Sequence, residues 1–291
     1  MHPAPSIIVF TTLSGLGFGL MVWLGLLPGD RGSAGAFFVA CLALGLASVG
    51  LLASLLHLGH PERAWKALSQ WQSSWLSREG VAAVATLGAF SIYAAGWVLT
   101  GQPVAWLGLL SAGLAVVTIA STAMIYAQLK TVPRWHSPLT PLLFLLYALA
   151  GGALLAGLSG AAAWLLLAAG AAQLAAWHVG DTAFARSGST LGTATGLGTL
   201  GALRQLEPPH TGSNYLLREM VFVIGRKHGR RLRIAALVLA IALPLVVALI
   251  SDLPPPVAIV LAMLHGSGVL VSRWLFFAEA EHVVGLYYDK R

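Results

Sequence analysis

The sequence predicts an all-α integral membrane protein with eight transmembrane helices. Of its 291 residues, 57% are hydrophobic and only 9% are Asp, Glu, Lys or Arg, and the mean hydropathy is +0.81. Soluble domains contain roughly 45–50% apolar and about 25% charged residues. A backbone in lipid must satisfy its own hydrogen bonds, which leaves helices or a closed barrel. Long apolar runs without strict alternation favour helices.

Eight apolar runs are each long enough to cross the hydrocarbon core of a bilayer, which takes about 20 residues. In order, they cover residues 6–27, 34–58, 80–100, 104–129, 139–159, 161–184, 232–251 and 254–278. The segments LPGDRGS, GQP, VPRWHSP and SDLPPP follow the first, third, fourth and seventh runs, and such clusters mark turns. Only small residues around Ser159 separate the fifth run from the sixth. We expect one membrane domain over residues 1–291.

The first run contains the small residues Gly15, Gly17 and Gly19. Because small residues let membrane helices approach closely, we expect them to serve packing. No basic region precedes this run, so we expect a retained span rather than a removed signal peptide.

Basic residues predict the orientation. An even number of spans places both termini on one side, together with the loops 59–79, 130–138 and 185–231. Sixteen of the seventeen Lys and Arg residues lie in these loops, in the tail or at the neighbouring span ends, and Arg31 is the exception. Cytoplasmic loops are enriched in Lys and Arg. We therefore expect both termini and the 185–231 loop in the cytoplasm of a bacterial inner membrane.

Cysteine content and charge distribution exclude several functions. The single cysteine, Cys41, cannot form an internal disulfide or hold an iron–sulfur cluster, which typically takes four thiolates. No motif predicts a metal site. The net charge of +7 comes from cations beside apolar spans, so we reject nucleic-acid binding. Any iron–sulfur centre must belong to a partner.

The polar segment HLGHPERAWKALSQWQSSWLSREG, residues 57–80, connects the second and third runs. Imidazole changes charge near neutral pH, so His57 can bind a quinone carbonyl and pass a proton. The alternative is an interfacial histidine at a helix end. Arg63 can orient a quinone oxygen, or it can anchor the protein beside Trp65 and Trp71.

Glu79 also has two interpretations. If Ser77 caps the third helix, Glu79 lies in the first turn, where the helix dipole favours an anion. Alternatively, Glu79 transfers the second proton of a two-electron quinone reaction, because desolvation helps a carboxyl group hold a proton. His57 and Glu79 end adjacent antiparallel spans, so we expect them to lie close together.

Two further histidines lie in or near the spans. His178 and Asp181 can extend a proton path, or they can form a buried pair. His265 lies near the middle of the eighth run, and haem b would need a second axial ligand at the same depth, from His57 or His178. We do not favour haem. Three residues after the eighth run are expected in solvent: Glu279, Glu281 and His282.

The long loop combines Asn214, Tyr215 and Glu219 with the basic residues Arg226 and Lys227. Basic loops can hold lipid phosphates. We favour docking of a partner, because a lipid anchor does not need the polar and aromatic residues.

Several motifs resemble the membrane anchor subunit family of dimethyl sulfoxide reductases. They are HLGHPERAW with SSWLSREG, TAMIYAQLKTVPRW, and NYLLREM with RKHGRRLR, and the opening HPAPSIIVFTTLSG is similar to the branch that serves sulfite dehydrogenases. The resemblance implies an eight-span anchor without its own metal centre. It also implies an iron–sulfur subunit and a molybdopterin catalytic subunit as partners, and electron exchange with ubiquinone or menaquinone.

The family's quinone-site residues correspond here to His57, Gly59, Arg63 and Glu79. In dimethyl sulfoxide reductases of this type the catalytic module faces the periplasm, whereas the cations here place the equivalent loops in the cytoplasm. This favours sulfite oxidation with quinone reduction over a quinol-oxidising anchor of a sulfoxide reductase. A proton or solute transporter is the third alternative, and it predicts several ionisable residues deep in the spans or an internal repeat. Only His265 meets that expectation.

Overall fold

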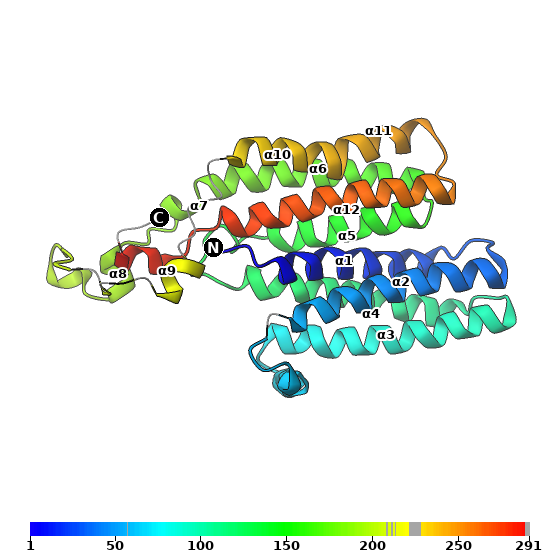
Figure 1. The fold of residues 1–291 in the computed structure, drawn as a ribbon, viewed down its shortest axis with the longest axis horizontal. Helices are drawn as coiled ribbons and strands as arrows, with labels where there is room; N and C mark the ends of the chain where they lie inside the picture. Colours follow the sequence, from blue (N-terminus) through cyan, green and yellow to red (C-terminus); the bar gives the residue numbers. More distant parts are fainter. Residues whose placement is uncertain (57, 208, 211, 213, 221–227, 289–291) are drawn as a thin grey trace.

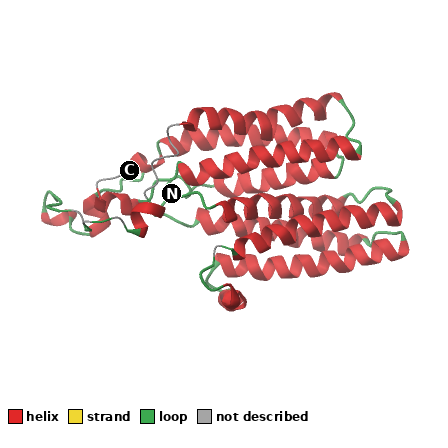
Figure 2. Ribbon diagram, in the orientation of Figure 1, coloured by secondary structure: helices red, strands yellow, loops and turns green. Residues whose placement is uncertain are grey.

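Long helices lie side by side in the computed structural model (Figures 1 and 2). It describes residues 1–56, 58–207, 209–210, 212, 214–220 and 228–288, and no strand occurs in these ranges. The prediction of an all-α membrane protein is confirmed.

Within the described residues, seven helical segments are long and apolar enough to cross a membrane. They are α1 (Pro5–Leu26), α2 (Gly32–Leu55), α3 (Trp75–Thr100), α4 (Ala105–Ala127), α6 (Ser159–Asp181), the continuous segment Gly229–Ile250, and α12 (Pro255–Ala278). The segment Gly229–Ile250 comprises α10 (Gly229–Leu237), the π-helical η4 (Val238–Ala242) and α11 (Leu243–Ile250). The remaining apolar helix, α5 (Leu139–Leu155), has 17 residues, at the short end of the spanning range. The count of eight spans is therefore approximate.

Short elements gather at one end of the bundle, which we name the polar end (Figure 1). They are η1 (Pro61–Gln70), α7 (Ala183–Arg186), α8 (Leu191–Thr195), η2 (Gly198–Leu200), α9 (Tyr215–Glu219) and η5 (Val283–Tyr288). The N-terminus and η5, the last described element, lie at this end (Figure 1). Arg31 lies at the opposite end, where its guanidinium donates to the carbonyl oxygen of Ala156 after α5, at 2.7 Å.

Helix α1 is central and contacts α2, α4, α5 and α12. A Cβ atom at Gly19 would lie 1.8 Å from the carbonyl oxygen of Ala148 on α5, and one at Gly17 would lie 2.4 Å from the amide nitrogen of Ala47 on α2. Glycine at these two positions permits backbone-to-backbone contact, in line with the expected packing role.

A π-helical segment interrupts the seventh span beside α12. A π-helix changes the local hydrogen-bond ladder, and here the carbonyl oxygen of Ala240 lies 2.6 Å from Nδ1 of His265. A Cβ atom at Gly268 would lie 2.1 Å from the amide nitrogen of Ala240. The seventh span therefore rests directly on the backbone of α12 at this point.

Candidate functional site

Helix α3 begins before the position that the apolar run predicts. Oγ of Ser74 accepts a hydrogen bond from the amide of Ser77 at 3.4 Å, and the helix begins at Trp75. The prediction that Ser77 caps this helix is wrong, because Ser74 takes that role. Glu79 consequently lies in the second turn rather than the first, and the helix start does not account for its position.

Glu79 is buried between α3 and α4, with 4% of its surface exposed. The hydroxyl group of Thr122 on α4 donates to the Glu79 carboxyl group. The carbonyl oxygen of Thr118 lies 3.1 Å from the same hydroxyl. One hydroxyl proton can serve only one of these acceptors. When Glu79 carries a proton, it can donate to Thr122, which then donates to Thr118, so every group is satisfied.

The α3–α4 seam carries further hydroxyl groups. Thr86 and Thr118 are hydrogen-bonded at 2.9 Å, and Oγ of Ser77 is buried without a partner among the described residues. Among the described residues, no Lys or Arg forms an ion pair with Glu79. In the described ranges Glu79 therefore has a hydroxyl partner and no ion-pair partner, which suits a carboxyl group that exchanges a proton.

The other residues of the predicted quinone site lie in the connection between α2 and α3. Arg63 belongs to η1, where Nε lies 3.8 Å from Glu62, and both side chains are 63% exposed. A Cβ atom at Gly59 would meet no described neighbour, so packing does not require glycine there. His57 lies outside the described residues. The expected proximity of His57 and Glu79 thus stays a prediction.

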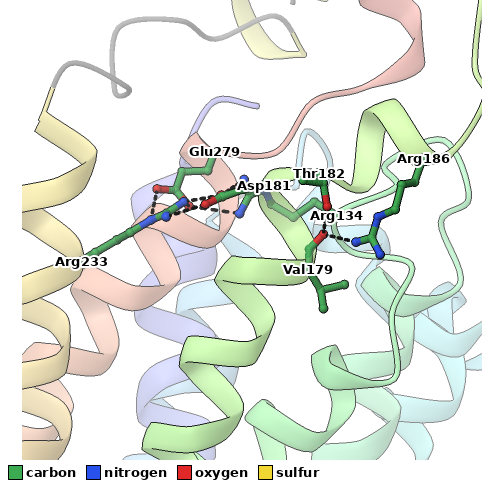
Figure 3. Close-up of polar contacts among 7 residues, drawn as sticks. All are labelled: Arg134, Val179, Asp181, Thr182, Arg186, Arg233 and Glu279. Carbon is green, nitrogen blue, oxygen red and sulfur yellow. Dashed lines mark hydrogen bonds and ion pairs between the residues drawn. The ribbon is translucent and has the colours of Figure 1, made fainter.

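Asp181 belongs to a cluster of four charges at the polar end, which we name the four-charge cluster (Figure 3). Arg134 contacts Asp181 at 2.7 Å and Glu279 at 3.3 Å. Arg233 contacts Asp181 at 2.6 Å and Glu279 at 2.8 Å. The cluster therefore joins the α4–α5 connection to α6, α10 and the end of α12. The expectation that Glu279 is solvated is wrong, because only 10% of its side chain is exposed.

The predicted pairing of His178 with Asp181 does not occur among the described contacts. His178 is exposed, and both carboxylate oxygens of Asp181 bond to arginines. A proton path through these two residues stays a prediction. Sequence reasoning missed the roles of Arg134 and Arg233, although Arg233 begins an apolar run and so needs a nearby carboxylate.

Part of the predicted docking segment is ordered around α9. Oδ1 of Asn214 accepts from the amide of Leu217 at 2.9 Å, which caps the helix, and Nδ2 donates to the hydroxyl of Tyr288 at 3.0 Å. Tyr215 is 63% exposed. Two of the predicted docking residues, Arg226 and Lys227, lie outside the described residues, as does the side chain of Glu219.

His265 is fully buried. Its Nδ1 lies 2.6 Å from the carbonyl oxygen of Ala240, and its Nε2 lies 3.1 Å from that of Tyr147. A haem ligand needs a free ring nitrogen, and here both nitrogens engage the backbone. No group of three or more metal-ligating side chains occurs in the described ranges. His265 therefore links α5, η4 and α12.

Comparison with known proteins agrees with this architecture. Residues 1–178 match the family described as DMSO reductase anchor subunit (DmsC). The C subunit of the sulfite dehydrogenase of Allochromatium vinosum is 33% identical, over 99% of each sequence. The C component of the anaerobic dimethyl sulfoxide reductase of Escherichia coli is 30% identical, over 60% of this sequence and 64% of its own. The protein is therefore a multi-pass membrane protein that belongs to the family of DMSO reductase anchor subunits.

Proposed function

We propose that this anchor subunit binds quinone and passes electrons between a partner's iron–sulfur cluster and the quinone pool. The observation that carries the proposal is the buried Glu79 carboxyl group, hydrogen-bonded to Thr122 and not ion-paired to a described cation. Reduction of a quinone to a quinol takes two electrons and two protons. The partner's cluster supplies the electrons, so the anchor must supply the protons and hold the head group.

We assign separate roles to the four positions that correspond to the family's quinone-site residues. Arg63 stabilises negative charge on a quinone oxygen as electrons arrive. His57 and Glu79 each deliver a proton, and each regains it from the polar end. Gly59 lets the backbone approach the head group, because it has no side chain in the way. The exposure of Arg63 and the free space at Gly59 leave room for a ligand beside η1.

We propose that electrons flow from sulfite oxidation on a partner subunit to the quinone, which is reduced. The support is the similarity to the sulfite dehydrogenase relative over 99% of both sequences, against 60% of this sequence for the sulfoxide reductase relative. The sulfite or sulfoxide chemistry belongs to a molybdopterin subunit, joined through an iron–sulfur subunit. The alternative is the reverse flow, in which quinol oxidation feeds sulfoxide reduction.

Both partners dock at the polar end, which we place in the cytoplasm of a bacterial inner membrane. The support is that the N-terminus, η5 and most of the described cations share this end, with Arg31 at the other. The exposed Tyr215 beside the Asn214 cap presents an aromatic side chain to such a partner.

The test uses the purified complex, with sulfite-dependent quinone reduction and quinol-dependent sulfoxide reduction measured side by side. Glu79→Gln should lower quinone turnover by about 10²-fold or more, since it removes a proton carrier. Subunit assembly, checked by size-exclusion chromatography, should be unchanged. Asp30→Asn removes an exposed carboxylate at the opposite end and should leave turnover intact. Full quinone turnover in an assembled Glu79→Gln complex would overturn the site assignment.

A further inference from the structure

A second candidate site lies in the other half of the bundle. A cavity of about 640 Å³ is lined by α5, α6, α7, α12 and the α4–α5 connection, and it opens at the polar end. Ligand pockets in proteins occupy roughly 300–1,000 Å³. The cavity therefore has room for an organic head group.

A buried guanidinium group lines the cavity. Arg273 on α12 is 4% exposed, and its guanidinium carbon lies 3.3 Å from the centre of the Phe144 ring. Its Nε atom has no hydrogen-bond partner among the described residues. Asp181 and Glu279 instead pair with other arginines, Arg134 and Arg233. A buried cation without an anion is unfavourable, so Arg273 needs a partner that the described residues do not provide.

Beside Arg273, the amide nitrogen of Gln173 also lacks an acceptor among the described residues. Oε1 of Gln173 accepts from the hydroxyl of Tyr147 at 2.8 Å and from that of Ser272 at 3.1 Å. The amide nitrogen of Gln173 donates to no described residue, and Gln173 lines the cavity. An amide nitrogen and a guanidinium group only donate. The inner wall of the cavity is therefore suited to oxygen atoms that accept hydrogen bonds.

A smaller cavity that Arg273 also lines does not offer an alternative site for an organic ligand. It measures about 10 Å³ and is lined by α1, α5 and α12, including Thr12 and His265. This is room for about one water molecule. Such a water can serve one N–H group of Arg273 but cannot neutralise its charge.

The lining of the large cavity is net positive. Lys130, Arg134, Arg186 and Arg273 line it, with Glu279 as the single carboxylate among the described lining residues. Basic pockets between membrane helices bind the head groups of anionic lipids. The aromatic and aliphatic part of the wall suits the adjoining glycerol and acyl carbons, and it includes Leu143, Phe144, Trp177 and Phe276.

We propose that this cavity binds an anionic phospholipid, with its phosphate held by Arg273. A phosphate provides both the negative charge and several acceptor oxygens, and it matches the planar guanidinium group. A neutral quinone head group would leave the charge of Arg273 uncompensated. Neither Glu79 nor any residue of η1 lines this cavity, so the two proposals can fail independently.

The test measures lipid retention by native mass spectrometry of the full-length protein. Detergent-solubilised protein is mixed with phosphatidylglycerol or phosphatidylcholine at matched concentrations. The wild type should retain one phosphatidylglycerol in preference to phosphatidylcholine. Arg273→Gln should weaken that binding by at least about tenfold, because it removes hydrogen bonds to a charged group. Lys66→Gln removes an exposed cation from η1, outside the cavity, and should have no effect.

A second variant keeps the proposal testable if Arg273→Gln does not fold. Ala176 lines the cavity, and Ala176→Phe places a ring in it without changing charge. The same loss of phosphatidylglycerol is expected. Undiminished retention by either folded variant would overturn the proposal. Equal binding of phosphatidylglycerol and phosphatidylcholine by the wild type would also overturn it. A third contradicting result would be that the wild type retains a bound quinone, and not a lipid, and that Arg273→Gln loses this quinone.

Discussion

The hydrogen bond between Glu79 on α3 and Thr122 on α4 joins two helices at a buried point. It gives Glu79 a neutral partner that can either donate to the carboxylate or accept from the protonated acid. Thr122 is therefore a positioning residue for the proposed proton carrier.

Thr122→Val keeps the shape of the side chain and removes its hydroxyl group. Leaving a buried carboxyl group without its partner should reduce quinone turnover by about tenfold. The pH dependence of turnover should also shift, which loss of packing alone does not cause. Thr122→Ser should restore both. A Thr122→Val complex with an unchanged pH profile would show that this hydroxyl does not act on Glu79.

Arg233→Gln should destabilise the polar end, because Asp181 and Glu279 would then share Arg134 alone. Loss of one partner of a buried pair costs about 3–5 kcal/mol. We expect about 1–2 kcal/mol here, because Asp181 is 45% exposed and solvent screens the cluster. The measurement is thermal unfolding in detergent, and the difference should shrink in high salt. Arg231→Gln, an exposed change in the same helix, is the control. Equal unfolding temperatures for the two variants would contradict a structural role for the cluster.

Gly19→Ala should destabilise the bundle although alanine is the better helix former. The added Cβ atom would lie 1.8 Å from the carbonyl oxygen of Ala148, and neither backbone can yield freely. Overpacking of this kind costs about 1–3 kcal/mol or more. Gly88→Ala on α3 is the matched control, since its Cβ atom meets no described neighbour. Unfolding temperatures of the two variants should change in opposite directions, and a stable Gly19→Ala protein would refute the close contact of α1 with α5.

Stability of the polar end should fall as the pH drops below the usual range of a histidine. Burial, followed by the nearby N-terminal ammonium group, lowers the pKa of His282, and its Nδ1 accepts from the amide of Val284 at 3.0 Å. The unfolded protein therefore binds this proton more readily, so stability rises with pH through that range and is lost below it. His282→Asn should flatten this dependence in unfolding experiments between acidic and neutral pH. A slope identical to the wild type would exclude His282 as its source.

The sequence was sufficient to locate the apolar helices but not their rotations. Span positions follow from length and composition, whereas helices that are apolar all round have no stripe to show which face is buried. For this reason the partnership of Glu79 with Thr122 could not be predicted. The sequence likewise presents Arg273 as one more cation near a span end, because its burial depends on how α12 packs against α5.

The cap of α3 and the charge partners of Glu279 could not be predicted either, because both depend on the path of the backbone. Ser74 and Ser77 are equally good caps by residue type, and only the path of the backbone after η1 selects Ser74. Its position after the last span predicts that Glu279 lies in solvent, yet arginines from two distant segments contact it. The roles of His57, Arg226 and Lys227 stay predictions, because these residues lie outside the described ranges.

The central place of α1 has a consequence for biogenesis. Its glycines meet α2, α4 and α5, and the helix also contacts α12. All of these helices leave the ribosome after α1. Helix α1 must therefore expose its glycine surface to lipid until α4 and α5 have been inserted. During that interval α1 is the part of the nascent protein most open to wrong helix pairing.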